Sequence, residues 1–166
     1  MTLAVFDIDG VVADVRHRLH FLEGGSGRNR SPRYQDWDSF FGHADADPVL
    51  EQGAALVARY QEDGHDIAWL TGRPGWLRRV TERWLQDAGL PTDELIMRGS
   101  GDYRPARLYK LEQLRRLSQD REILLFVDDD PDVVETAAAG GFTTLLATWV
   151  PHSKTLKNAQ EVSGRT

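Results

Sequence analysis

The feature that most constrains this chain is a pair of aspartates at the end of its first apolar run. Residues 3–6 read Leu-Ala-Val-Phe, and Asp7-Ile8-Asp9-Gly10 follows directly. A short apolar run that stops at polar residues is typical of a buried strand whose carboxyl end opens into a site. Because side chains alternate along a strand, we expect Asp7 and Asp9 on one face. Two carboxylates this close repel each other unless a cation or a shared proton relieves them.

Two further apolar runs, at 67–70 and 123–127, also end abruptly in polar residues. A predicted helix over 109–117 lies between them and contains a lysine. The polar motifs of the chain are, in order, Asp7-Ile8-Asp9, Thr71-Gly72-Arg73, Lys110 and Asp128-Asp129. Three of the four therefore stand at the ends of predicted strands, where α/β proteins place their sites.

The composition is that of a single globular domain. Of 166 residues, 40% are hydrophobic and 28% are charged, which supports one core behind a five- or six-stranded sheet. The absence of cysteine excludes disulfides and thiolate metal sites. The chain shows neither a signal-peptide pattern nor an apolar run near the ~20 residues that span a bilayer. We therefore expect a cytoplasmic protein with no membrane partner.

The charge of the chain is uneven. Its net charge of −6 argues against a protein that coats nucleic acid, yet residues 71–121 hold eleven basic and seven acidic side chains. A local excess of positive charge can steer a phosphorylated ligand even on an acidic protein. The alternative is that five of these arginines only line solvated helix faces: Arg78, Arg79, Arg83, Arg115 and Arg116.

Strands and helices alternate along the chain, which predicts the α/β class: a three-layer, Rossmann-like, mostly parallel sheet with helices on both faces. Further helices are predicted at 49–63, 76–89 and 131–140, and further strands at 95–97 and 143–148. Residues 1–149 form the predicted domain, in which 10–48 is a flap and small insertion. Residues 150–166 form a polar tail that we expect to be frayed or loosely docked.

The insertion has two predicted parts. Residues 13–23 suggest either the start of a helix or an irregular flap. Ser31-Pro32 then predicts a short helix, because a capping residue followed by proline is typical of a helix start. Its aromatic stripe consists of Tyr34, Trp37, Phe40 and Phe41.

In order and context the four motifs resemble those of the haloacid dehalogenase (HAD) superfamily of aspartate-nucleophile phosphotransferases, up to about Trp149. The resemblance implies a HAD-like fold, and neither gap between the motifs is long enough for a full cap domain, so we expect an open site. Receiver domains use the same residue types, but there the acidic pair comes first and the lysine last. Here Asp128-Asp129 follows Lys110, which argues against a receiver domain.

The resemblance also implies a role for each motif. Asp7 would attack phosphorus and form an aspartyl-phosphate, while Asp9 would protonate the leaving alcohol and then activate water. Thr71 would hydrogen-bond the phosphoryl oxygens and Lys110 would offset their charge. Mg²⁺ is the expected cofactor, since it prefers oxygen ligands. The expected metal ligands are Asp7, the backbone carbonyl of Asp9, Asp128 and Asp129. By contrast, we expect Asp130 and Asp132 to cap the helix at 131–140.

The stretch from Arg83 to Lys110 has a more specific resemblance, to the 3′-phosphatase domain of phage-type polynucleotide kinase-phosphatase. That family needs an arginine shortly after the DxD motif and the arginine of the threonine motif, which here are Arg18 and Arg73. With Gly72, these are the expected substrate-binding residues, since an arginine fork can grip two phosphate oxygens. The resemblance implies 3′-phosphate ends of nucleic acid, or nucleotides, as the substrate. The alternative for Arg18 is a solvated residue of the flap.

The chain departs from that family in three ways. Ala106 stands where the family has an aspartate four residues before its lysine, and Val11 replaces the common threonine. Loss of the aspartate is expected to loosen metal binding or to leave Lys110 less well oriented. The phosphate loop GxxxxGK[ST] of a kinase is absent. The chain is therefore a stand-alone phosphatase-like domain, or it works beside a separate kinase.

Two other functions remain open on sequence grounds. One is a HAD phosphatase for a small phosphorylated metabolite or nucleotide, which the acidic charge favours. The other is a non-catalytic module that binds a phosphorylated ligand. The aromatic residues Trp37, Phe40 and Phe41 have two interpretations as well: a platform on which a terminal base stacks, or simple core packing.

Overall fold

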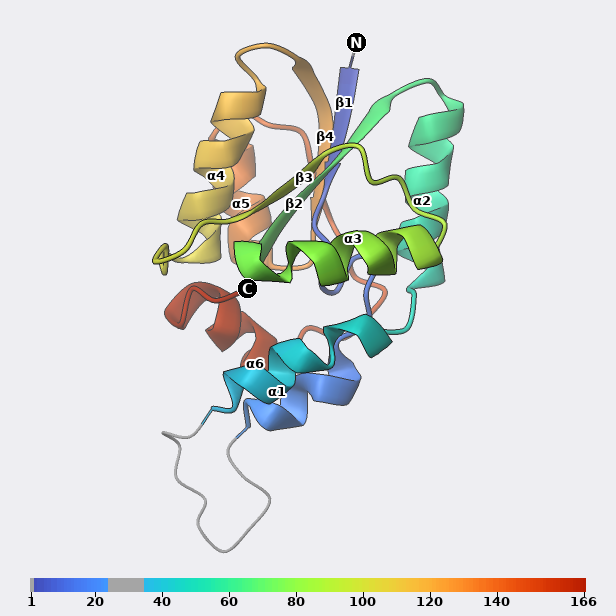
Figure 1. The fold of residues 1–166 in the computed structure, drawn as a ribbon. Coiled ribbons are helices and arrows are strands. Elements are labelled where there is room, and N and C mark those ends of the chain that lie inside the picture. Colours follow the sequence, from blue (N-terminus) through green and yellow to red (C-terminus); the bar gives the residue numbers. More distant parts are fainter. Residues whose placement is uncertain (1, 24–34) are drawn as a thin grey trace, which may run out of the picture.

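The computed structural model describes residues 2–23 and 35–166. Its centre is a five-stranded sheet in the order β3-β2-β1-β4-β5, and every strand pair is parallel (Figure 1). The strands are β1 (Thr2–Phe6), β2 (Asp66–Pro74), β3 (Leu95–Arg98), β4 (Glu122–Asp128) and β5 (Thr144–Leu146). The predicted α/β fold with a parallel sheet is therefore confirmed.

Helices cover both faces of the sheet (Figure 1). They are α2 (Glu51–Glu62), α3 (Arg78–Asp87), α4 (Ala106–Leu117) and α5 (Pro131–Ala139). Side chains of β1 point alternately to the two faces of the sheet. Ala4 and Phe6 pack in one cluster with α2 and α3. Leu3 and Val5 pack in the opposite cluster with α4 and α5. Since β1 is buried on both faces from Leu3 to Phe6, this part of the strand is wholly apolar, as central parallel strands are.

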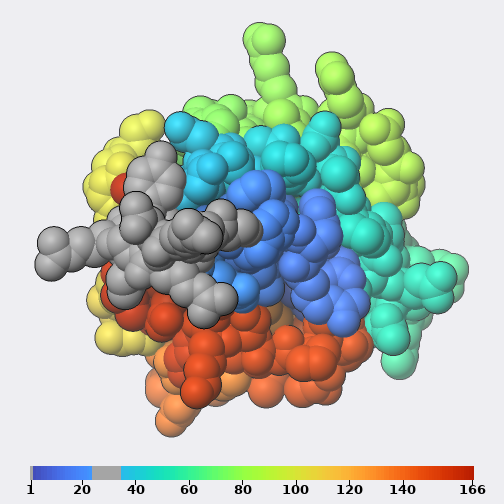
Figure 2. Space-filling model, turned by 90° about the horizontal axis from the view of Figure 1, so that it is seen from below, coloured from blue at the N-terminus to red at the C-terminus, as the bar shows by residue number. Residues whose placement is uncertain are grey.

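A third apolar cluster lies beyond the carboxyl ends of the strands. It joins two short elements of the insertion, the 3₁₀ helix η1 (Arg16–Phe21) and α1 (Trp37–Gly42), to the chain's C-terminal segment. In the view from below, the blue, cyan and red surfaces of these segments lie beside one another (Figure 2). The expected open site is therefore wrong, because these segments cover the end of the sheet at which the polar motifs lie.

The short elements differ in detail from their predictions. Helix α1 begins at Trp37, where the Asp36 carboxylate accepts a hydrogen bond from the backbone N–H of Ser39 at 2.9 Å. The predicted start at Ser31-Pro32 lies outside the described residues. Phe40 and Phe41 are buried, so the core-packing interpretation holds for both. Two other short elements are the 3₁₀ helices η2 (Ala44–Ala46) and η3 (Gly75–Leu77).

The start of α5 agrees with its prediction in part. Asp130 is the N-cap and accepts a hydrogen bond from the backbone N–H of Asp132 at 2.9 Å, with Pro131 in the first turn. Asp132 lies in the first turn, where its negative charge is favourable to the helix dipole, and its carboxylate also pairs with Lys157 at 2.9 Å.

The C-terminal segment is docked rather than frayed. It forms α6 (Lys154–Lys157) and a π-helical turn, η4 (Asn158–Val162). Ser153 caps α6, and Leu156 and Ala159 are buried in the third cluster. Their spacing of three places them on one helix face. This small apolar face is short enough to be overlooked in a polar sequence, yet it fixes the segment against the domain.

No helix among the described residues is both long and apolar enough to cross a membrane.

Candidate active site

The carboxyl end of β1 places Asp7 next to the lysine of α4. The backbone N–H of Asp7 bonds to the carbonyl of Val127 at 2.9 Å, so the sheet holds the residue in position. The Lys110 ammonium lies 2.9 Å from Asp7 Oδ2 and 2.6 Å from Asp128 Oδ2. All three side chains are buried. The structure therefore brings together the first, third and fourth sequence motifs.

Asp129 completes what we call the acidic cluster: Asp7, Asp128 and Asp129, whose oxygens lie within 4.8 Å of one another. Asp129 can lie close to the backbone of Gly10 only because that residue has no side chain: a Cβ on Gly10 would lie 2.1 Å from Asp129 Oδ2. Gly10 also has a φ of +77°, a conformation that favours glycine. Asp129 Oδ1 accepts a hydrogen bond from the Gln160 amide at 3.3 Å.

Burial and mutual repulsion set the electrostatics of the acidic cluster. Burial raises the pKa of Asp7 to about 7, and Asp128 and Asp9 add to this while Lys110 opposes it. Burial raises the pKa of Asp128 and of Asp129 too. Burial lowers the pKa of Lys110, but Asp128 and Asp7 outweigh it and raise that pKa, so the ammonium is charged. Three ionised carboxylates beside one ammonium leave an excess of negative charge.

This donor set fits a magnesium ion. It offers oxygen atoms alone, and its negative excess is what a divalent cation relieves. The expected ligands Asp7, Asp128 and Asp129 meet at one place, whereas the Asp9 carboxylate lies outside the group. The predicted role of the Asp9 backbone carbonyl as a metal ligand stays a prediction.

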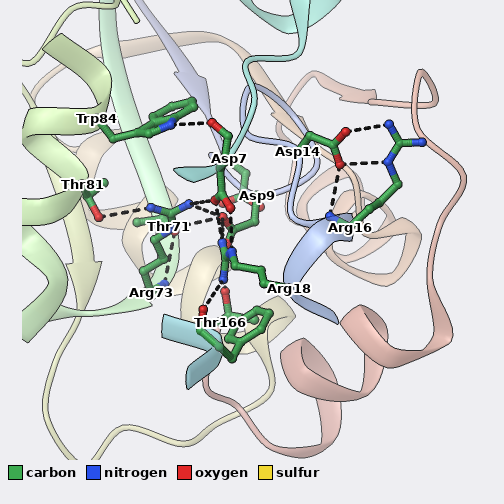
Figure 3. Close-up of polar contacts among 12 residues, drawn as sticks. Asp7, Asp9, Asp14, Arg16, Arg18, Thr71, Arg73, Thr81, Trp84 and Thr166 are labelled. Atoms are coloured by element: carbon green, nitrogen blue, oxygen red, sulfur yellow. Dashed lines mark hydrogen bonds and ion pairs between the residues drawn. The ribbon is translucent and has the colours of Figure 1, made fainter. Parts of the chain in front are cut away.

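The Asp9 carboxylate instead faces two arginines (Figure 3). Its Oδ1 accepts hydrogen bonds from Arg73 Nε at 2.9 Å and Nη2 at 2.6 Å, and Arg18 Nη2 lies 3.3 Å away. Its Oδ2 accepts a hydrogen bond from the Thr166 hydroxyl at 2.8 Å. Burial would raise the pKa of Asp9, but Arg73 and Arg18 hold it well below its usual range.

A fourth residue, Asp47, closes this network. Arg18 Nε and Nη2 bond to its two carboxylate oxygens at 2.7 and 2.8 Å, and Arg73 Nη2 bonds to Oδ2 at 3.0 Å. We call Asp9, Asp47, Arg18 and Arg73 the arginine–aspartate network; its formal charges cancel. Arg18 is fully buried, so the solvated-flap alternative is wrong. Both arginines direct their Nε and Nη2 donors to these carboxylates, and their predicted contact with substrate stays a prediction.

The threonine motif lies on β2 beside this network. Thr71 is fully buried, and its hydroxyl accepts a hydrogen bond from the backbone N–H of Arg73 at 3.2 Å. The carbonyl of Gly72 accepts a hydrogen bond from Arg98 Nε at 3.2 Å. A Cβ on Gly72 would lie 2.1 Å from the carbonyl carbon of Thr166, so the C-terminal segment reaches this turn. The roles predicted for Thr71 and Gly72 are not tested by this arrangement.

The departures from the family pattern leave Lys110 in place. Ala106 is buried in the first turn of α4, where it packs in the core with Tyr109. Lys110 is nevertheless held by two carboxylates, so it does not need an aspartate at 106 for its orientation. Val11 is buried, and its carbonyl accepts a hydrogen bond from the Trp149 indole at 2.9 Å.

Several residues of the site carry no motif in the sequence. Asp47 stands in a loop with nothing to mark it, and its backbone carbonyl accepts a hydrogen bond from the Trp84 indole at 2.8 Å. Thr81 accepts a bond from Arg73 Nη1 at 3.3 Å. The contacts of Gln160 and Thr166 depend on how the C-terminal segment docks. Arg98, the last residue of β3, is the exception, because it lies in the stretch from Arg83 to Lys110 that carries the more specific resemblance.

Comparison with known proteins places this site in a family. A family model described as "PITM 1-3, LNS2 domain" matches residues 4–128. Among solved structures, a chain of the Pnkp1/Rnl/Hen1 complex is 22% identical with a TM-score of 0.69, over 91% of this chain and 46% of that one. The present chain thus spans less than half the length of that neighbour.

Two other neighbours are HAD-like hydrolases. The class C acid phosphatase from Bacillus anthracis is 18% identical with a TM-score of 0.63, over 87% of this chain and 65% of that chain. The haloacid dehalogenase-like hydrolase SP0104 from Streptococcus pneumoniae is 14% identical with a TM-score of 0.61, over 97% and 91%. No curated protein matches the chain.

These neighbours confirm the predicted HAD-like fold, and the family model covers most of the chain. The protein therefore belongs to the family of the LNS2 domain of PITM 1–3, and its fold is HAD-like.

Proposed function

We propose that the protein is a Mg²⁺-dependent phosphomonoester hydrolase that works through an aspartyl-phosphate on Asp7. The observation that carries this proposal is the position of Lys110 between Asp7 and Asp128, with Asp129 beside them. A nucleophilic carboxylate, a fixed ammonium and an acidic cluster for a divalent cation are the parts that phosphoryl transfer needs. The HAD-like fold supports the same reaction class.

In this mechanism Asp7 forms a bond to phosphorus while the bond from phosphorus to the leaving alcohol breaks. Asp9 gives its proton to the alcohol oxygen, then takes a proton from the water that attacks the aspartyl-phosphate and releases inorganic phosphate. Lys110 offsets the charge on the phosphoryl oxygens, and Thr71 hydrogen-bonds them. Bound Mg²⁺ would supply charge neutralisation between the phosphoryl group and the carboxylates.

The state of Asp9 sets a condition on the first step. Its Oδ1 is engaged by Arg73 and Arg18, and its Oδ2 accepts a bond from Thr166. The proton for the leaving alcohol can be carried only on Oδ2, because two guanidinium groups already donate to Oδ1. Asp9 can therefore act as an acid only once Thr166 has left Oδ2 and the hydrogen bonds from Arg73 and Arg18, which hold its pKa well below the usual range, have weakened.

For the substrate, we propose 3′-phosphate ends of nucleic acid or nucleotides. This rests on the stretch from Arg83 to Lys110 and on the similarity to a chain of the Pnkp1/Rnl/Hen1 complex. The phosphate loop of a kinase is absent from these 166 residues, so a kinase activity that works with this site would come from outside them. If several phosphates of a polynucleotide are contacted, its affinity should fall steeply with salt. A small metabolite would show a flat salt dependence.

The test is phosphate release from a 3′-phosphorylated oligonucleotide, its 5′-phosphorylated counterpart and a panel of phosphorylated metabolites. Each is measured with Mg²⁺ and with a chelator, for the wild type and for Asp7→Asn. Asp63→Asn, a change at an exposed carboxylate, is the matched control. Preference for the 3′-phosphorylated strand supports the substrate proposal. Preference for a metabolite keeps the mechanism and replaces the substrate.

A second candidate is a non-catalytic module that binds a phosphorylated ligand. The observation in its favour is that Asp9 is held ionised by Arg73 and covered by Thr166. In that case the wild type releases no phosphate from any substrate, while phosphorylated ligands still bind in a calorimeter. Turnover that Asp7→Asn abolishes removes this candidate.

A further inference from the structure

An aromatic cavity of about 280 Å³ adjoins the candidate active site. Two of its aromatic side chains are unusually open for their size: Trp76 is 64% exposed and Tyr103 is 59% exposed. Trp37 and Phe41 complete the aromatic lining. Exposed aromatic side chains gathered around one hollow indicate a binding surface rather than a core.

Arg98 connects this cavity to the threonine motif. Its Nε donates to the carbonyl of Gly72 at 3.2 Å, and its Nη1 donates to the carbonyl of Arg104 at 2.8 Å. Arg98 is only 2% exposed, and its buried Nη2 has no hydrogen-bond partner among the described residues. A buried donor without an acceptor is costly, so this nitrogen is suited to an acceptor that a ligand brings.

The chain's own C-terminal segment extends from the cavity to Asp9. The Arg165 guanidinium carbon lies 5.1 Å from the centre of the Trp37 ring and 5.2 Å from that of Tyr103. The next residue, Thr166, donates its hydroxyl to Asp9 Oδ2 at 2.8 Å (Figure 3). A planar group thus lies among aromatic rings while an adjoining hydroxyl lies on the predicted acid–base residue.

We propose that the cavity is the subsite for the nucleobase of a nucleotide substrate, and that residues 164–166, of which Gly164 and Arg165 form part of its wall, move aside when substrate enters. The proposal rests on the proposed function and deepens it. The Thr166 hydroxyl marks the position of the leaving alcohol oxygen at Asp9. The Arg165 guanidinium marks the position of the planar group that this alcohol carries. Tyr103 and Trp37 stack the base, and Arg98 Nη2 donates to one of its acceptors.

The chemistry of the lining favours a base over other groups. A base stacks on aromatic rings as the flat guanidinium does, and it carries acceptors that an arginine lacks. A sugar or glycerol phosphate has no planar face to stack. An aliphatic chain would leave Arg98 Nη2 without an acceptor. The volume lies at the lower end for ligand pockets, which suits one base rather than a larger molecule.

The first experiment compares two substrates in three proteins. The substrates are adenosine 3′-monophosphate and glycerol phosphate, and the proteins are the wild type, Tyr103→Ala and Leu108→Ala. Leu108 is exposed, lies outside the cavity lining and serves as the matched control. Tyr103→Ala should lower kcat/KM about tenfold for the nucleotide, from the loss of base stacking, and less than twofold for glycerol phosphate. Leu108→Ala should change neither.

A variant of Arg165 tests whether substrate displaces residues 164–166. Arg165→Ala weakens the segment's hold on the aromatic rings, so it should lower KM for the nucleotide about two- to fivefold. It should leave kcat for glycerol phosphate within twofold. An unchanged KM for the nucleotide would show that Arg165 does not compete with the base.

Binding without turnover separates this proposal from the proposed function. The ligand is adenosine 3′-monophosphate, titrated into Asp7→Asn and into Asp7→Asn with Tyr103→Ala. Weaker binding by the double variant supports the subsite, even if no protein releases phosphate. Equal binding by the two variants overturns the subsite, and so does an equal fall in kcat/KM for both substrates in Tyr103→Ala. In either case, phosphate release by the wild type leaves the proposed function standing.

Discussion

Two charged groups lie side by side at the carboxyl ends of the strands, and they are organised in opposite ways. The acidic cluster has more carboxylates than cations, and burial raises the pKa of Asp7 to about 7. The arginine–aspartate network has as many positive as negative charges, and the pKa of Asp9 is held well below its usual range. Asp7 and Asp9 are two residues apart, so their surroundings rather than their spacing decide their states.

The difference indicates a division of work. An unbalanced buried cluster is costly by itself and gains stability from a cation or proton, which suits a site that takes up ligands. In the balanced network each charged group is paired within the network. Such an arrangement suits a structural role, in which it holds the Asp9 carboxylate in one position. Each prediction below changes one of the two groups and asks whether the other stays as it was.

The largest effect is expected for activity in the acidic cluster. Asp7→Asn removes the nucleophile and should lower kcat by ~10³-fold or more. It also removes a carboxylate that burial disfavours, so the free energy of unfolding at pH 8 without metal should rise or stay unchanged. Steady-state phosphate release and urea unfolding measure the two quantities. A marked loss of stability would show that the cluster is a structural ion group after all.

A change in the arginine–aspartate network should instead lower the stability of the fold. Asp47→Asn leaves Arg18 and Arg73 with a single buried carboxylate between them, and it should cost about 3–5 kcal/mol of unfolding free energy. Asp45→Asn, an exposed change two residues away, is the matched control and should cost little. Urea unfolding measures both. A cost below ~1 kcal/mol for Asp47→Asn would contradict the role of the network as a frame.

The two groups should also differ in their pH dependence. The folded state raises the pKa of Asp7 from 3.8 to about 7, so folded protein binds this proton more tightly than unfolded chain. The contribution of Asp7 to stability should therefore fall as pH rises from about 4 to about 7. Asp9 has a lowered pKa, so its contribution is full above about pH 4 and is lost as pH falls further.

Magnesium provides the measurement of that contrast. Since Mg²⁺ and protons compete for the acidic cluster, added Mg²⁺ should raise the melting temperature by several degrees at pH 8 and by less at pH 5. Asp7→Asn should reduce the rise at pH 8. An equal rise at both pH values, or one that Asp7→Asn leaves intact, would place the ion elsewhere.

The smallest effect is expected where the C-terminal segment meets the network. Thr166→Val keeps the shape of the side chain but removes the hydroxyl that donates to Asp9. A hydrogen bond to a charged group contributes about 1.5–3 kcal/mol, so unfolding free energy should drop by up to that amount. Since the tail then competes less well, KM should fall slightly. A rise in KM would instead make Thr166 part of substrate binding.

The sequence predicted the acidic cluster because its members follow local rules. Asp7 and Asp128 stand at the ends of apolar strands, and Lys110 lies on a helix between them in the chain. Parallel strands bring such ends together whatever the loops do. The order of the motifs was therefore enough to predict the fold and most of this cluster.

The network and the C-terminal segment were not predictable in the same way. Asp47 comes from an irregular loop, and Thr166 from a segment whose apolar contact with the domain rests on Leu156 and Ala159. Their contacts span 26 and 157 residues of sequence, and no periodicity links them. Such contacts depend on tertiary packing, which a single sequence does not reveal.

The central claim is that Asp7 carries the phosphoryl group during turnover. Rapid acid quenching with a substrate labelled in its phosphate, followed by peptide mapping, tests it most directly. We expect label on the peptide that contains Asp7, cleavable by hydroxylamine, and no label in Asp7→Asn. Phosphate release by the wild type with no label on that peptide, or label that persists in Asp7→Asn, would contradict it.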